Sequence, residues 1–195
     1  FHLYGLSIIF TIICMTGLIF ALNMYDGINL QFGFHLLIIF TFFIFEGILV
    51  NFFIFFNILI LLFLYLNLKN KIYMGDSGVY FLGALVSITF LKNYNIEVLK
   101  IEEIIVISLI PILDMFRVIG VRVFIRSHPF KKDHLHLHHI LKKKYKKKYL
   151  WHIGSFLTLF NILLLKTVNQ IYIVLFLSIV IYLLIIVYLS LNKKK

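Results

Sequence analysis

Seven blocks of apolar residues are the feature of this sequence that most constrains its fold. They lie at about residues 3–22, 33–50, 51–67, 78–92, 104–125, 151–168 and 171–191. A helix needs about 20 residues to cross the ~30 Å hydrocarbon core of a membrane, so each block is a predicted span. The second and third blocks run together with only Glu46 and Asn51 between them. Because their combined length is too great for one span, we expect a helical hairpin there.

The composition excludes a water-soluble domain. Of the 195 residues, 62% are hydrophobic and 14% are charged, and the mean hydropathy is +1.02, whereas soluble domains are about half apolar and about a quarter charged. A disulfide framework is excluded because Cys14 is the only cysteine. The sequence therefore predicts an all-α, polytopic transmembrane helix bundle of about seven spans, with residues 1–195 forming a single integral membrane domain.

The basic residues predict how this bundle is oriented. Lys and Arg number 19 against 8 acidic residues, a net charge of +11. If seven spans alternate, the loops at 23–32, 67–77 and 126–150 share one face with the C-terminus, and most of the basic residues lie there. Basic loops remain in the cytoplasm, so we assign this face to the cytoplasmic side. The lysine run at 142–148 favours anionic lipid headgroups as a partner. The aromatic residues lie inside the apolar blocks, so no nucleic-acid partner is expected.

Three polar motifs fall on the predicted cytoplasmic face: NMYDGINL at 23–30, MGDSG at 74–78 and DHLHLHH at 133–139. Their convergence on one face predicts a single site. In the first motif, Asn23 and Asp26 lie one turn apart on the same face of a helix. They could coordinate a cation or hold a polar ligand. The alternative is an ordinary helix C-cap and turn, which uses the same residue types.

The second motif stands immediately before an apolar block. Asp76 and Ser77 could cap the amides of the helix that begins there, and a helix N-terminus favours a nearby anion. The flanking glycines would let a phosphate approach the backbone. A carboxylate at this position also suits Mg²⁺, which takes one or two carboxylates together with phosphate oxygens and water.

The third motif is the densest, with four histidines after Asp133: His134, His136, His138 and His139. Such spacing can indicate a transition-metal site, and a zinc protein is one hypothesis. The alternation of His with Leu favours an extended segment. A competing use is phosphate recognition by the imidazoles with Arg122 and Arg126. A basic loop at the lipid headgroups is the third interpretation.

Two further features have structural interpretations. Asp114 and Arg117 lie at i and i+3 inside a predicted span, where we expect an ion pair. His35 and His152 stand alone at span edges, so we predict interfacial positions for them.

Together these segments resemble the polyprenyl-phosphate N-acetylhexosamine-1-phosphate transferases (glycosyltransferase family 4), in particular the undecaprenyl-phosphate GlcNAc-1-phosphate transferase branch, which is related to phospho-MurNAc-pentapeptide translocase. The motifs that carry the resemblance occur in order as NMYDG, MGDSG, PILDMFR and PFKKDHLHLHH. The resemblance implies transfer of a HexNAc-1-phosphate, GlcNAc-1-phosphate above all, from a UDP-sugar to undecaprenyl phosphate. UMP would leave, and the product would initiate cell-envelope polysaccharide synthesis in a bacterial plasma (inner) membrane.

The resemblance also implies residue roles and partners. Asp26, Asp76 and His136 would be catalytic, and Asp76 would bind Mg²⁺, with Mn²⁺ as an alternative metal. The substrate-binding residues would be Asn23, Gly27, Arg122, His138 and His139. UDP-N-acetylhexosamine and undecaprenyl phosphate would be the substrates, and a homodimer is an allowed assembly.

The family also carries a paired-Asp motif upstream of the NxxDG segment, and no adjacent Asp pair occurs in this sequence. We therefore expect that the chain is the C-terminal portion of a larger transferase and is incomplete on its own. The rival hypothesis is a transporter or channel, whose polar residues would be spread through the membrane depth. Here the polar groups gather at one face, and the span interiors are almost wholly apolar.

Overall fold

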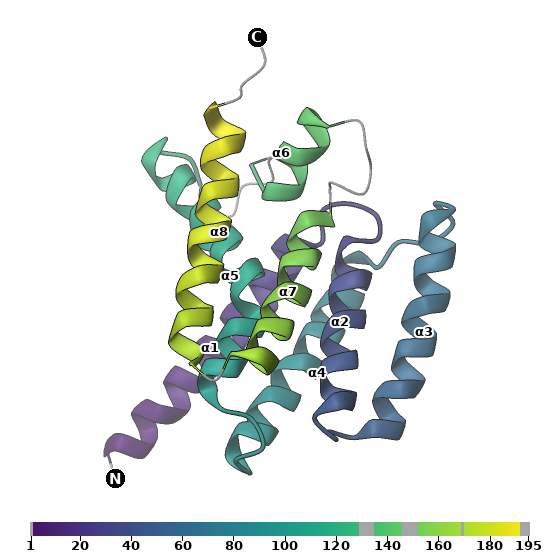
Figure 1. The fold of residues 1–195 in the computed structure, drawn as a ribbon, viewed down its shortest axis with the longest axis vertical. Helices are drawn as coiled ribbons and strands as arrows, with labels where there is room; N and C mark the ends of the chain where they lie inside the picture. The colour runs from purple at the N-terminus through teal and green to yellow at the C-terminus, as the bar shows by residue number, and fades with distance from the viewer. Residues whose placement is uncertain (1, 129–134, 146–151, 169, 192–195) are drawn as a thin grey trace.

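The computed structural model describes residues 2–128, 135–145, 152–168 and 170–191, and the side chains among them from residue 7 onward. Within these ranges the chain is helical and has no strand (Figure 1). The helices are α1 (His2–Tyr25), α2 (Gln31–Phe45), α3 (Val50–Leu68), α4 (Gly75–Asn95), α5 (Ile101–Phe124), α6 (Leu137–Lys144), α7 (Ile153–Thr167) and α8 (Ile171–Leu191). Each of the seven predicted blocks corresponds to one helix, and the predicted hairpin is α2 and α3.

Four helices are long and apolar enough to cross a membrane. In the described part of the chain these are Ser7–Tyr25 of α1, and α3, α5 and α8. The other two apolar helices, α2 and α7, have 15 residues each, and α4 has 21 residues but a more polar composition. These helices are those of a membrane protein, and length and apolarity support four of the seven predicted crossings.

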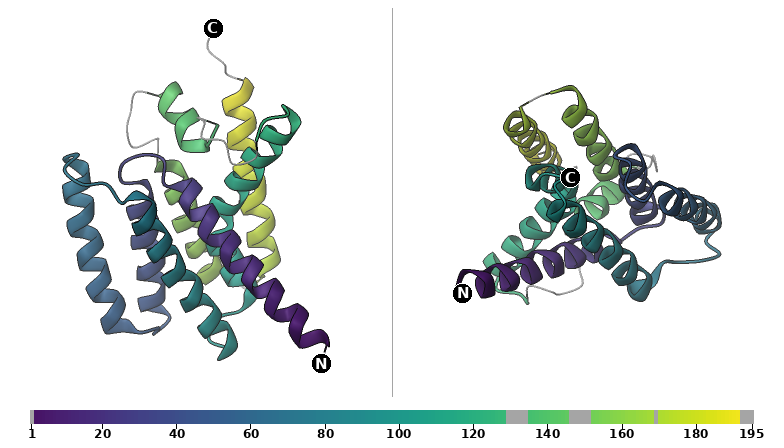
Figure 2. Two further views of the ribbon diagram at one scale, coloured as in Figure 1. Left: turned by 180° about the vertical axis from the view of Figure 1, so that it is seen from behind. Right: turned by 90° about the horizontal axis from the view of Figure 1, so that it is seen from below.

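Successive long helices run in opposite directions, so their connections collect at two ends of the bundle (Figures 1 and 2). One end carries α6, the start of α7 and the loops that join α1 to α2 and α3 to α4. The turns between α2 and α3, α4 and α5, and α7 and α8 lie at the opposite end. Helix α1 packs on α4 and α5, and α7 packs on α5 and α2. The predicted gathering of the polar motifs at one end is therefore present in the fold.

Phenylalanines dominate the core between the α2–α3 hairpin and α4. The ring centroid of Phe43 lies 4.9 Å from that of Phe53 and 5.2 Å from that of Phe90. Aromatic rings at such distances add to the stabilisation from apolar burial. The tight contact of α2 with α3 requires Gly33, because a Cβ atom there would lie 2.6 Å from Leu64 Cδ2. This packing fixes where α3 ends beside α2, next to the polar loops.

A row of buried polar side chains on α7 faces the other helices. Ser155 bonds with the Tyr25 hydroxyl at 3.2 Å, and Thr158 with His35 Nδ1 at 3.4 Å. One turn further, Asn161 accepts a hydrogen bond of 2.8 Å from the α8 residue Ser178. The prediction of almost wholly apolar span interiors is therefore wrong for α7. Such hydrogen bonds between helices supply the attraction that apolar contact cannot supply in lipid.

His35 and His152 belong to this same interior and have partners on other helices, while the interfacial depth predicted for them stays a prediction. His35 is fully buried beside Tyr25, whose ring centroid is 4.9 Å away. His152 is 9% exposed and shares a 3.2 Å hydrogen bond with Gln31 Oε1. An isolated histidine in the sequence gave no sign of partners more than 100 positions away.

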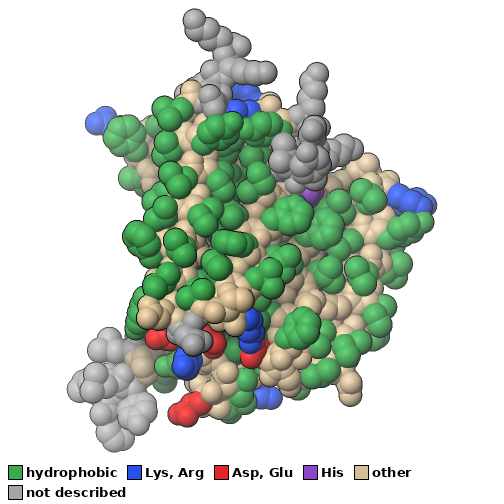
Figure 3. All heavy atoms as spheres, in the orientation of Figure 1, with side chains coloured by type: hydrophobic (Ala, Val, Ile, Leu, Met, Phe, Trp, Pro, Cys, Tyr) green, Lys and Arg blue, Asp and Glu red, His purple; other side chains and the backbone are tan. Residues whose placement is uncertain are grey.

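Apolar side chains cover most of the face in Figure 3, and the acidic side chains visible there gather toward the end opposite α6. Glu46, in the turn between α2 and α3, forms an ion pair with Lys166 of α7. Both side chains are partly exposed, so the pair contributes little to stability.

The histidine motif is helical where the sequence analysis favoured an extended segment. His136 is extended (φ −62°, ψ 150°), and α6 begins at Leu137. Leu137 and Leu141 are one turn apart and both are buried, so α6 is held by an apolar face that the His-Leu alternation concealed. His138 and His139 consequently point in different directions from the helix. Asp133, His134 and Lys146 to Lys148 lie outside the described residues.

Candidate active site

Asn67 joins the two loops at the α6 end of the bundle. Its side-chain oxygen Oδ1 accepts a 2.7 Å hydrogen bond from Leu30 N–H, and its side-chain nitrogen Nδ2 donates one of 2.7 Å to the backbone carbonyl of Ile72. Leu30 has a positive φ of 71°, an unfavourable conformation for a residue with a side chain. The hydrogen bond that Leu30 N–H donates to Asn67 Oδ1 holds Leu30 in this conformation. The loop after the NMYDG motif is therefore fixed beside the loop that leads to MGDSG.

This arrangement brings two carboxylates near each other. Asp26 follows the end of α1 and is partly buried, whereas Asp76 is exposed in the first turn of α4. Burial, and then the negative charge of Asp76, raise the pKa of Asp26 to about 6. Neither carboxylate forms a hydrogen bond or an ion pair with another described residue. The two charges are uncompensated within this part of the chain, which is an environment that favours a cation.

The two glycines of MGDSG have different structural roles. Gly75 has a φ of +68°, which favours glycine, and a Cβ atom there would meet no atom within 4 Å. A Cβ atom on Gly78 would lie 3.0 Å from Met74 Sδ. No side chain caps α4 at its N-cap residue. Capping therefore does not explain Asp76, and open space beside Gly75 leaves room for a ligand.

Gly27 is required by the close approach of His138. A Cβ atom at Gly27 would lie only 1.9 Å from His138 Nε2. Its φ is not positive, so this glycine does not form the left-handed C-cap that the alternative interpretation of the motif would require. The turn after α1 is therefore shaped to admit an imidazole.

His138 itself is buried among rings and polar groups. It is 1% exposed, and neither ring nitrogen has a hydrogen-bond partner among the described residues. Burial, with the neighbouring His139 as the next cause, lowers the pKa of His138 to about 3, so the ring is neutral at pH 7. Its ring centroid is 4.4 Å from that of His139 and 5.7 Å from that of the parallel ring of His136. Buried polar atoms without partners are costly and often mark a ligand site.

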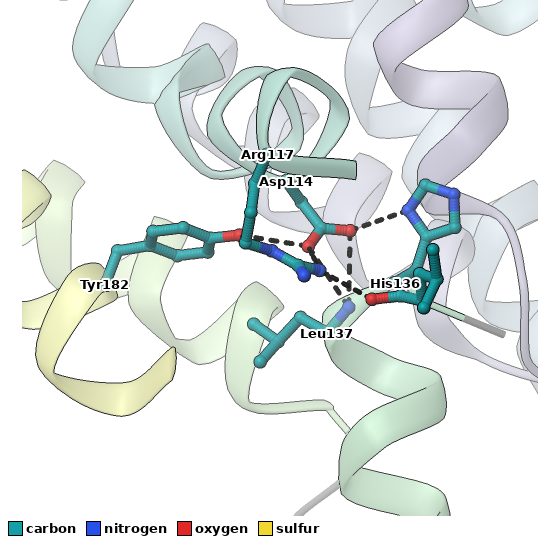
Figure 4. Close-up of polar contacts among 6 residues, drawn as sticks. Asp114, Arg117, His136, Leu137 and Tyr182 are labelled. Atoms are coloured by element: carbon teal, nitrogen blue, oxygen red, sulfur yellow. Dashed lines mark hydrogen bonds and ion pairs between the residues drawn. The ribbon is translucent and has the colours of Figure 1, made fainter. Parts of the chain in front are cut away.

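Asp114 holds the other end of this histidine group (Figure 4). Its carboxylate lies 2.8 Å from His136 Nδ1 and 2.7 Å from Arg117 Nη2, which confirms the predicted ion pair with Arg117. It also accepts hydrogen bonds from the Tyr182 hydroxyl at 3.0 Å and from Leu137 N–H at 3.1 Å. A series of neighbours thus connects Asp26, through Gly27, His138 and His136, to Asp114, and the charge of Asp76 acts on its first member.

Two cavities adjoin the loop that follows Asp26. The smaller has a volume of about 270 Å³ and is lined by polar residues that include Asp26, Asn29 and Asn67, with Tyr73 and Gly75. The larger has a volume of about 810 Å³. It lies between α2 and α7 and is mainly apolar; its lining includes Phe34, Ile38, Phe156, Leu159, Lys142 and His152. Both cavities are lined by residues 27–30 and Tyr73, so they meet at this loop.

The remaining predicted residues lie at different distances from this group. The amide nitrogen of Asn23, one turn before Asp26, is buried without a hydrogen-bond partner among the described residues. Arg122 lies about two turns beyond Asp114 on α5 and is 2% exposed. Its phosphate-binding role stays a prediction. Asn67 and Tyr182 are not predicted from the sequence, because neither belongs to a recognisable motif.

The metal hypotheses differ in how well these residues fit them. In the described ranges no group of three or more His, Cys, Asp or Glu side chains is arranged to hold an ion, so the zinc hypothesis gains no support there. Mg²⁺ needs only one or two carboxylates when a substrate supplies phosphate oxygens. Asp76, with Asp26 beside it, is a donor set of that kind.

Of the three comparisons with known proteins, one finds a match, and it covers the first half of the site. No curated protein and no solved structure matches the chain. A match to a protein-family model does exist, and it reaches from α1 to α4 and contains the NMYDG and MGDSG motifs with both carboxylates. Residues 2–93 match the family model of glycosyl transferase family 4.

Proposed function

We propose that this chain belongs to glycosyl transferase family 4 and serves the transfer of HexNAc-1-phosphate, specifically GlcNAc-1-phosphate, from a UDP-sugar to undecaprenyl phosphate. The product would initiate a cell-envelope polysaccharide at the cytoplasmic side of a bacterial plasma membrane. The observation that carries the proposal is the pair Asp26 and Asp76. These carboxylates come from two motifs of the matched region, and the charge of Asp76 acts on Asp26. Asp26 lines the smaller cavity together with Gly75, the residue before Asp76, and neither carboxylate has a cationic partner among the described residues.

The two cavities suit the two substrates. The smaller one has a mixed lining whose polar side chains include Asp26, Asn29 and Asn67, so it fits the nucleotide sugar. The larger one has an apolar lining from α2 and α7, with Lys142 also contributing to it, so it fits a prenyl chain that ends in a phosphate. Because the cavities meet at residues 27–30, the acceptor phosphate and the diphosphate would meet there.

The reaction is a phosphoryl transfer between two anions. An oxygen of the lipid phosphate forms a bond to the phosphorus next to the sugar, the P–O bond between the two phosphates of the UDP-sugar breaks, and UMP leaves. Such a reaction depends mainly on positioning and on neutralising charge. Asn23 and His138 have buried nitrogens available for substrate oxygens, and His136 and Arg122 are the further candidates for contacts to phosphate.

Asp76 would hold the Mg²⁺ ion, and Asp26 would contribute to the same negatively charged surroundings. When bound, Mg²⁺ supplies charge neutralisation for the diphosphate and the leaving group. Repulsion between the two carboxylates would decrease at the same time.

A direct assay tests the function. Full-length protein in membranes is incubated with radiolabelled UDP-GlcNAc, undecaprenyl phosphate and Mg²⁺, and labelled lipid and released UMP are measured. We expect both products in equal amounts, and neither without the lipid phosphate. UDP-GalNAc and UDP-glucose, tested in parallel, separate the sugar specificity from the reaction class. No UMP release from any UDP-N-acetylhexosamine would contradict the proposal.

The pKa of Asp26 predicts a pH dependence of stability. The folded state raises this pKa from the ordinary 3.8 to about 6, so between these values the folded state binds the proton more tightly than the unfolded state. The cost of the charged carboxylate is absent below about pH 3.8 and complete above about pH 6, so it lowers stability as the pH rises. We expect the Tm of detergent-purified protein, free of divalent cations, to fall less over this range in Asp26→Asn than in the wild type. Identical slopes would show that Asp26 is not buried beside Asp76.

The transporter hypothesis is not favoured by the buried polar row on α7. Those side chains are hydrogen-bonded to one another across helices, as in packing contacts, and do not line either of the two cavities described, apart from Ser155.

A further inference from the structure

Asp114 is connected to three separate parts of the fold. It lies on α5, is 2% exposed, and accepts hydrogen bonds from Tyr182 of α8, Arg117 of its own helix and the segment at the start of α6. Arg117 also donates to the carbonyl of Leu135 at 2.7 Å and, through Nε, to the Tyr182 hydroxyl at 3.0 Å. The carboxylate and the guanidinium together thus hold residues 135–137 against α5 and α8 (Figure 4).

The contact with His136 fixes the chemistry of its ring. A carboxylate can only accept a hydrogen bond, so the proton on the 2.8 Å contact belongs to His136 Nδ1. In the neutral imidazole, the lone pair is then on Nε2, and the ring cannot rotate without losing this bond. The orientation and the tautomer of His136 are both set by Asp114.

Contacts of the His136 ring lead toward the two cavities. The ring of His138 lies parallel to that of His136, with an interplanar angle of 5° and centroids 5.7 Å apart. On its other side His138 is in contact distance of Gly27, which lines both cavities. The ring that Asp114 holds is therefore stacked on the imidazole beside the Asp26–Gly27 turn.

We propose that Asp114 is a positioning residue for the transfer reaction, which acts by holding His136 with its proton on Nδ1. The inference rests on the proposed function. Asp114 does not touch the substrates in this role. Its effect on the reaction passes through His136.

The test compares Asp114→Asn, His136→Ala and the double variant in full-length protein, with kcat and the KM for UDP-GlcNAc measured separately. The Asn side chain has one acceptor oxygen and one donor NH2 group, whereas the carboxylate has two acceptor oxygens. Asn therefore cannot accept all of the hydrogen bonds that Asp114 accepts. We expect kcat of Asp114→Asn to fall about 10- to 100-fold, while the KM changes less than about threefold. In the His136→Ala background, Asp114→Asn should cause no further loss of kcat, because the residue through which it acts is absent.

Tyr182→Phe is the matched control, since it removes one donor to Asp114 and leaves the bond to His136. It should lower kcat by less than about threefold. If Asp114→Asn does not accumulate in membranes, Arg117→Lys replaces it, with the same expected dependence on His136. Additive losses in the double variant, or a rise in KM at unchanged kcat, would overturn the positioning role while wild-type transfer stands. An inactive wild-type protein would instead overturn the proposed function, and this inference with it.

Discussion

Replacement of Asp76 by Asn is expected to abolish Mg²⁺-dependent transfer, with a loss of about 1,000-fold or more. Asn keeps the size of the side chain but removes the negative charge that a hard divalent cation requires. Asp76 is exposed and has no hydrogen-bond partner among the described residues, so the substitution should not disturb the fold. The measurement is transfer of radiolabelled sugar phosphate from UDP-GlcNAc to undecaprenyl phosphate, with Tm as the check of folding.

Glu97→Gln is the matched control for Asp76→Asn. It makes the same change of charge at an exposed carboxylate in the turn between α4 and α5, at the opposite end of the bundle. Its activity should equal that of the wild type. Wild-type activity in Asp76→Asn at saturating Mg²⁺ would exclude Asp76 as the metal ligand.

Replacement of Gly27 by Ala is the second substitution with a large expected effect. The new Cβ atom would stand 1.9 Å from His138 Nε2, far inside van der Waals contact. His138 has little room to retreat, because the rings of His136, His139 and Tyr25 surround it. We expect at least a 10-fold loss of transfer activity and a decrease in Tm, because α6 must shift away from the turn.

Gly17→Ala serves as the control, since it lies in the same helix as the residues before the turn and a Cβ atom there meets nothing within 4 Å. It should change neither activity nor Tm by much. The double variant Gly27→Ala, His138→Ala removes the clash, so it should recover the Tm of His138→Ala alone without recovering activity. A Gly27→Ala protein with full activity would show that His138 does not occupy this place in the working enzyme.

Helix positions could be predicted from this sequence because membrane helices are read from local composition. The seven apolar blocks, the α2–α3 hairpin and the common end for the polar motifs follow from span length and alternation alone. Short-range pairs such as Asp114 and Arg117 are also accessible, since helical spacing brings i and i+3 together. These features need no knowledge of how one helix lies against another.

Contacts between distant segments could not be predicted. Tyr182 is 68 positions from Asp114, and a single tyrosine in an apolar block carries no sign of such a partner. The burial of His138 depends on α6, whose apolar face of Leu137 and Leu141 was hidden in a motif that alternates His with Leu. Gly27 was singled out from the NMYDG motif, but the close approach of the His138 imidazole, which requires a glycine there, is visible only in three dimensions.

The shortness of α2 and α7 has a consequence for the membrane around the protein. Each has 15 residues and therefore a length of about 22 Å, which is less than the ~30 Å thickness of the hydrocarbon core. If both helices cross the membrane, as the sequence predicts, they create a hydrophobic mismatch, which lipids relieve by thinning the bilayer. The larger cavity lies between these two helices. Headgroups in the thinned bilayer would sit closer to its centre, so a phosphate on a membrane lipid would approach the cavity without leaving its own depth.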